Sequence, residues 1–169
     1  RARNDGFVDR YPSGVMTEPS FNTRMTSGQM NIGQALQRAG YATGVVGKWD
    51  QGRAVGPETE ALPGPARYWR NAWSDVDEQA DPRDPEVSAL MARNHDAVCE
   101  GIRGQGFDYA SSIYWGNPES FANHPLNIHN QEWITQGALD FIDQAHEDPF
   151  FLYFNTTLHH IPHPQESLL

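Results

Sequence analysis

The chain has 169 residues and a mass of 19.0 kDa, enough for one modest domain with its own core. It carries 12 basic and 22 acidic side chains, so its formal net charge is −10 and its pI is near 5.0. This balance disfavours nucleic acid and anionic membranes as partners, and an anionic substrate would need local positive groups to hold it. No stretch approaches the roughly 18 consecutive apolar residues of a membrane-spanning helix, so no membrane span is expected.

The first predicted elements are a helix over residues 31–39 and a strand over 41–46. Apolar residues recur at helical spacing between positions 32 and 39. Asn31 can cap this helix together with Gln34, and Gly40 stands where a left-handed residue ends a helix. The small and β-branched residues that follow are typical of a buried parallel strand. A helix joined to a strand by one glycine favours an α/β fold.

Lys48 follows this strand in a turn between Gly47 and Gly52. It is the only lysine in the chain, whereas the other eleven basic residues are arginines. The compact ammonium of lysine is not interchangeable with a guanidinium, so Lys48 is a candidate for binding an anion. The alternative is a surface lysine without a specific role.

The middle of the chain is rich in proline and tryptophan over residues 53–83, which predicts a long loop. A helix is expected over residues 85–103, with Asp84 as its cap and Pro85 at its first position. Cys99 is the only cysteine, so no internal disulfide can form, and we expect it to be a small buried apolar residue. Residues 111–125 are aromatic and predicted to be irregular. Their rings either line a substrate pocket or pack against the sheet.

The last predicted elements are a helix over residues 132–146 and an apolar strand over 150–155, expected to be central in the sheet. Three histidines follow this strand: His159, His160 and His163. Ligands of open α/β sheets bind outside the carboxyl ends of the strands. If the two predicted strands are neighbours, Lys48 and His160 reach one crevice. A zinc pair through His160 and His163, or ordinary loop histidines, are the alternatives.

Several of these segments resemble the sulfatase family, within the alkaline-phosphatase-like superfamily. The turn that presents the lysine matches one family pattern at seven positions: Gly40, Tyr41, Thr43, Gly47, Lys48, Trp49 and Gly52. Shorter matches lie at residues 10–15, in the Gly-Phe-Asp sequence at 106–108, and in the strand at 150–153. That last strand leads into a His-x-Pro sequence that begins at His160.

The resemblance implies an α/β fold with a mostly parallel central sheet flanked by helices. Residues 1–169 would form a single partial catalytic domain, an internal fragment, with 53–103 as an insertion. It implies a sulfuric ester hydrolase that acts on a small-molecule or glycan sulfate ester. The formylglycine nucleophile and the ligands of a Ca²⁺ ion would lie outside this chain, so the chain alone is expected to be inactive. A secreted or periplasmic location is favoured by the same resemblance.

The resemblance also implies roles for individual residues. Lys48 and His160 would bind the sulfate and take part in acid–base chemistry, and His163 would contact the substrate. Asp50 stands where the family usually has histidine. It could orient Lys48 through an ion pair, accept a proton from the nucleophile, or face solvent as a turn residue.

Two other functions stay open at this point. One is a hydrolase of phosphate esters or phosphonates from the same superfamily. The other is a non-catalytic relative that binds anionic or sulfated glycans, for which Asp50 is the motivating feature. Cys99 and Arg103 have the Cys–Arg spacing of the family's nucleophile motif. The proline of that motif is missing and the segment is predicted to be helical, so Cys99 is not expected to be the nucleophile.

Overall fold

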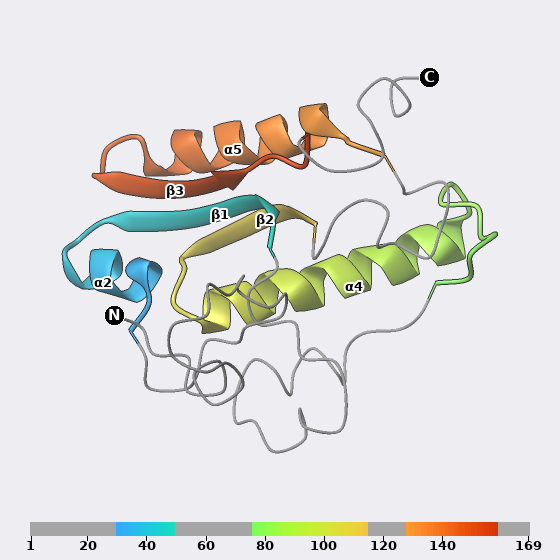
Figure 1. Ribbon diagram of the computed structural model, residues 1–169, viewed down its shortest axis with the longest axis horizontal. Coiled ribbons are helices and arrows are strands. Elements are labelled where there is room, and N and C mark those ends of the chain that lie inside the picture. Colours follow the sequence, from blue (N-terminus) through green and yellow to red (C-terminus); the bar gives the residue numbers. More distant parts are fainter. Residues whose placement is uncertain (1–29, 50–75, 115–127, 159–169) are drawn as a thin grey trace, which may run out of the picture.

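The computed structural model describes residues 30–49, 76–114 and 128–158 (Figure 1). In chain order these segments form three helices and three strands: α2 (Ile32–Arg38), β1 (Ala42–Lys48), α4 (Pro85–Gly104), β2 (Tyr109–Tyr114), α5 (Gln131–Ala145) and β3 (Phe150–Asn155). The predicted helices at 31–39, 85–103 and 132–146 are confirmed to within one residue at each end. The fold is α/β, as expected.

The three strands form one sheet in the order β2-β1-β3, and both pairs are parallel. Val45 and Val46 of β1 are fully buried and point to opposite faces of this sheet. Val45 packs with α4 residues such as Val98 and Ile102, whereas Val46 packs with Ile134 of α5. Helices therefore cover both faces, with α2 and α4 on one side and α5 on the other (Figure 1).

Helix α2 begins and ends as its sequence predicts. The Asn31 side chain accepts a hydrogen bond from the Gln34 amide, and the Gln34 side chain accepts one from the Asn31 amide, which completes a capping box. At the other end Gly40 has a φ of +86°. The amide of Tyr41 donates to the Leu36 carbonyl there, as in a Schellman motif. This turn leads the chain directly into β1.

Asp108 joins α2, β1 and the start of β2. Its Oδ2 accepts hydrogen bonds from both the amide and the hydroxyl of Thr43, each at 2.9 Å, and its Oδ1 accepts one from Gln37 Nε2 at 2.6 Å. The Asp108 amide donates to the Thr43 carbonyl at 3.0 Å. Thr43 is fully buried, so its hydroxyl needs such a partner. The segment around Thr43 and the Gly-Phe-Asp sequence at 106–108, which matched the family pattern separately, are thus in direct contact.

Two expectations about the strands are wrong. Residues Tyr109–Tyr114 form β2, although irregular structure was predicted from Ser111 onward. Its two serines lower the apolar content, but strand pairing with β1 and burial between α4 and α5 override that local signal. In the described part of the chain β1, rather than β3, is central, and Phe150, Tyr153 and Phe154 of β3 are exposed.

β1 and β3 approach each other closely at Gly47. This residue has a φ of +90°, and a Cβ atom placed on it would overlap the carbonyl oxygen of Asn155. Gly40 has a similar φ of +86°, but a Cβ atom there would meet nothing within 4 Å. Alanine substitutions at the two glycines therefore separate the free-energy cost of the left-handed backbone conformation from the free-energy cost of a steric overlap.

We expect Gly47→Ala to lower the free energy of unfolding by roughly 2–5 kcal/mol, because it adds backbone overlap to the left-handed conformation. Gly40→Ala is the matched control and should cost only about 1–2 kcal/mol. Urea unfolding of both variants of the whole protein measures the difference. Equal losses would show that the approach of β1 to β3 does not require a glycine.

Candidate functional site

Because the three strands are parallel, their carboxyl ends all lie at one edge of the sheet. Lys48 ends β1, Tyr114 ends β2 and Asn155 ends β3. Lys48 pairs with Tyr114, and Gly47 pairs with Asn155 on the other side. A shared crevice for Lys48 and the segment after residue 155 requires that their two strands be neighbours. β1 and β3 are neighbours, so this condition is met.

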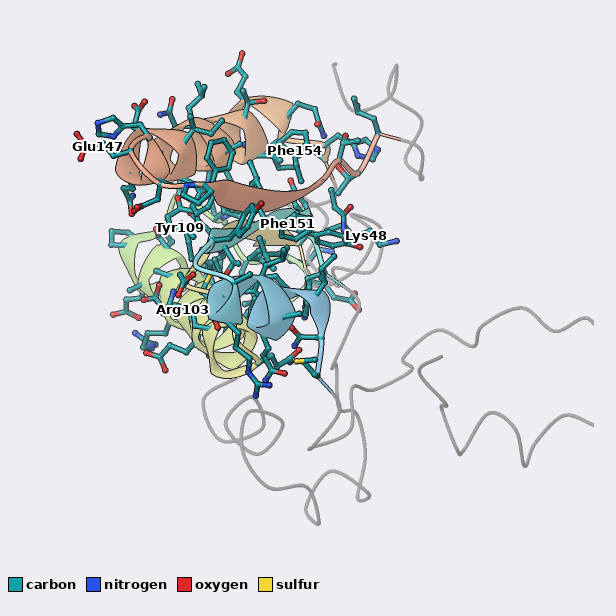
Figure 2. The ribbon with its side chains drawn as sticks, turned by 90° about the vertical axis from the view of Figure 1, so that its left-hand side faces the viewer. Lys48, Arg103, Tyr109, Glu147, Phe151 and Phe154 are labelled. Carbon is teal, nitrogen blue, oxygen red and sulfur yellow. The ribbon has the colours of Figure 1, made fainter. Side chains whose placement is uncertain are left out.

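Lys48 is half-buried at this edge, and Figure 2 shows its side chain at the margin of the described residues, pointing outward from the packed core. Its carbonyl oxygen accepts a hydrogen bond from Asn155 Nδ2 at 3.0 Å. The next amide, that of Trp49, donates to the Tyr114 carbonyl at 2.6 Å. The backbone around Lys48 is thus held from both neighbouring strands, so the root of its side chain is fixed.

A β-bulge in β2 lies beside the end of β1. Val46 pairs with Ser111 and Gly47 pairs with Ile113, so Ser112 is an extra residue, and its φ is +52°. The Ser112 hydroxyl donates to the Trp133 carbonyl of α5 at 2.8 Å. Bulges bend a strand and re-aim the residues that follow it, and they are frequent next to functional sites. Here the bulge sets the register that places Tyr114 opposite Lys48.

His95 of α4 supports this bulge from the opposite face of the sheet. Its Nε2 accepts a hydrogen bond from the Ile113 amide at 3.2 Å, so the ring must be unprotonated at that nitrogen. Burial lowers the pKa of His95 below its ordinary value of 6.5. Two smaller effects act on the same pKa: the negative charge of Asp96 raises it and the positive charge of Arg103 lowers it. The ring also packs against Trp133, with 5.4 Å between the centroids. His95 is therefore a neutral structural partner of β2.

Cys99 lies one turn after His95, with its sulfur 3.5 Å from His95 Nε2. It is buried in the core, and burial raises the pKa of its thiol to about 12. Only the thiolate is a strong nucleophile, so this thiol is inert near neutral pH. The expectation of a small buried residue is confirmed.

The residues that hold the chain where it leaves β3 were not predicted from the sequence. Thr157 is fully buried and His129 is buried, and the Thr157 hydroxyl lies 2.7 Å from His129 Nδ1. Asn155 was not among the predicted site residues, yet its side chain donates to the Lys48 carbonyl. The position of Asn155 at the last residue of an apolar strand was the available signal. His129 had no local signal, because its partner lies 28 residues away.

Lys48 is the one predicted site residue within the described segments. Asp50, His159, His160 and His163 lie outside them, as does most of the aromatic segment 111–125. Tyr114 is the described aromatic residue of that segment, and its buried ring packs against Trp133, which favours packing over a pocket role.

No group of three or more His, Cys, Asp or Glu side chains suited to a metal ion occurs among the residues that the structure describes. None of the helices in the described segments combines the length and hydrophobicity that a membrane crossing needs.

Comparison with known proteins gives matches that cover most of the chain. The family model described as Sulfatase matches residues 6–168. An arylsulfatase from Hemicentrotus pulcherrimus is 26% identical over 147 residues, a match that covers 80% of this chain and 22% of that protein. The chain thus spans about a fifth of the length of this curated relative.

The buried, neutral state of His95 predicts that stability depends on pH. The unfolded chain takes up a proton near pH 6.5, whereas folded His95 does so only at lower pH. Stability should therefore be constant above about pH 6.5 and fall as the pH drops, by at most about 1.4 kcal/mol per pH unit, until folded His95 is protonated.

Urea unfolding of the whole protein at several pH values between 7.5 and 5 would measure this slope. Carboxylates add their own slope, so the test is the difference between the wild type and His95→Phe, which cannot titrate. Parallel curves for the wild type and His95→Phe would refute the prediction.

Proposed function

Because the chain belongs to the sulfatase family, we propose that the whole protein hydrolyses a sulfate ester at the carboxyl edge of this sheet. The observation that carries the proposal is the placement of Lys48. It ends the central strand, its backbone is held by β2 and β3, and it is the only lysine of an otherwise arginine-containing chain. Residues 1–169 would form one partial catalytic domain with an insertion at 53–103.

Lys48 would act on the charge of the sulfate group. A sulfate ester carries one negative charge, and cleavage moves further charge onto the bridging oxygen. A fixed ammonium directed at these oxygens stabilises the transition state, and one such donor typically contributes about 3–4 kcal/mol. The hydrogen bonds that fix the Lys48 backbone reduce the reorganisation that this interaction would otherwise require.

His160 would donate a hydrogen bond to a sulfate oxygen or a proton to the leaving oxygen. Histidine suits this role because its ordinary pKa allows it to carry or release a proton near neutral pH. His163, three residues on, would contribute to substrate binding. Asp50 would orient Lys48 or accept a proton from the nucleophile. The pairing of β1 with β3 supports these assignments, since both segments leave the sheet at one edge.

The remaining parts of the proposed site lie outside this chain. Family resemblance assigns the nucleophile to a formylglycine and a charge-neutralising role to Ca²⁺, and we place both elsewhere in the whole protein. The substrate would be a small-molecule or glycan sulfate ester. The same resemblance supports a secreted or periplasmic location.

We expect Lys48→Ala in the whole protein to lower the kcat for an aryl sulfate by at least about 100-fold, the effect of losing one charge donor. Arg38→Ala is the matched control, because Arg38 is an exposed cation at the end of α2, before β1 begins. It should leave turnover unchanged. Steady-state kinetics on both variants provide the measurement, and full activity in Lys48→Ala would remove Lys48 from the mechanism.

Substrate preference separates the proposed function from its two alternatives. We expect the whole protein to hydrolyse an aryl sulfate at least about 100-fold more efficiently than the matching aryl phosphate, because a site selects the charge and geometry of its transition state. The ratio of the two kcat/KM values is the measurement. The reverse ratio would indicate a phosphate ester or phosphonate hydrolase. No turnover of either ester, with sulfated glycan still bound, would indicate a binding protein.

A further inference from the structure

The chain is held by buried hydrogen bonds where it leaves β3. The Thr157 hydroxyl lies 2.7 Å from Nδ1 of His129, and it also accepts a hydrogen bond from Gln131 Nε2 at 3.1 Å. Thr157 is fully buried and His129 is 7% exposed. Gln131 is the first residue of α5 and His129 lies two residues before it. The helix begins at the end of the sheet where β3 stops (Figure 1).

A second contact secures the residue before Thr157. The hydroxyl of Thr156 donates to Gln131 Oε1 at 2.9 Å, and the same hydroxyl accepts a hydrogen bond from the Leu158 amide at 3.2 Å. Gln131 thus contacts both threonines with one carboxamide. We name His129, Gln131, Thr156 and Thr157 the exit cluster, because they fix the backbone as it leaves β3.

The segment that carries His129 is itself anchored to β2. The phenol of Tyr114 donates to the Ile128 carbonyl at 3.0 Å and accepts a hydrogen bond from the Asn130 amide at 3.1 Å. Burial raises the pKa of Tyr114, so the phenol keeps its proton and its donor role at neutral pH. The exit cluster is therefore anchored to β2 through Tyr114, and this anchoring fixes the position of the backbone where it leaves β3.

We propose that His129 is a positioning residue, which through the Thr157 hydroxyl sets the course of the chain toward His160, three residues later. This inference rests on the proposed function of His160. Loss of His129 would leave a buried hydroxyl with one partner fewer, and the backbone would shift to find another. A displacement of about 1 Å at a reacting group can lower a rate by roughly 100-fold.

The test compares substitutions at His129 in the whole protein. His129→Ala should lower the kcat for an aryl sulfate by about 10- to 100-fold while KM changes by less than about threefold. His129→Asn places an amide near the position of Nδ1 and should restore most of the kcat. His129→Gln places its amide near Nε2 instead and should not. His146→Ala removes an exposed histidine at the far end of α5 and is the control that should match the wild type.

Thr157→Val covers the case in which His129→Ala does not fold. It keeps the shape of the side chain and removes only the hydroxyl, so it should lower kcat to the same extent. The inference is overturned if His129→Ala or Thr157→Val keeps kcat within about twofold of the wild type. It is also overturned if the Asn and Gln variants are equally active.

Hydrogen exchange separates this inference from the proposed function. If the wild type hydrolyses no aryl sulfate, the proposed function fails, and exchange then decides about the exit cluster alone. His129→Ala should accelerate exchange at the amides of Thr157 and Leu158 by at least about tenfold, with α5 unchanged, because their local opening becomes easier. Unchanged exchange at these amides would overturn the positioning role of His129 whether or not the protein is active.

Discussion

The parallel contact between β1 and β3 at Gly47 is the constraint on which the site depends. No side chain fits between Gly47 and the Asn155 carbonyl, so the two strands can run side by side to their ends only with glycine there. The close approach also lets the Asn155 side chain reach the Lys48 carbonyl. The close packing of β1 against β3 at Gly47 therefore also fixes the backbone position of Lys48, the one lysine of the chain.

On the other side of β1, buried polar groups determine the geometry. The bulge at Ser112 would leave the Ile113 amide without a ladder partner, and His95 supplies one from α4. The Ser112 hydroxyl finds its partner on α5, on the opposite face of the sheet. Both helices therefore stabilise one irregularity in β2, and that irregularity sets the register of Tyr114 against Lys48. Cys99 and His95 of α4 serve structure, because burial keeps the thiol protonated and the imidazole neutral.

The carboxyl edge of the sheet is a continuous set of contacts. Tyr114 links the end of β2 to Trp49 and to the segment before α5, and that segment holds the exit of β3 through His129 and Gln131. Each strand end is thereby fixed relative to the other two. Such preorganisation is what a charge-stabilising site requires, because its donors must already be in place when charge develops.

The sequence by itself determined the three helices, the strands that became β1 and β3, and the resemblance to the family. Helix caps such as Asn31 and Asp84, the left-handed Gly40 and the motif around Lys48 act over a few residues, so they can be predicted from spacing. Tertiary structure alone decided that β1 is central, that Ser111 and Ser112 belong to a strand, and that His129 contacts Thr157. These features depend on partners that are distant in the chain, and no local propensity encodes them.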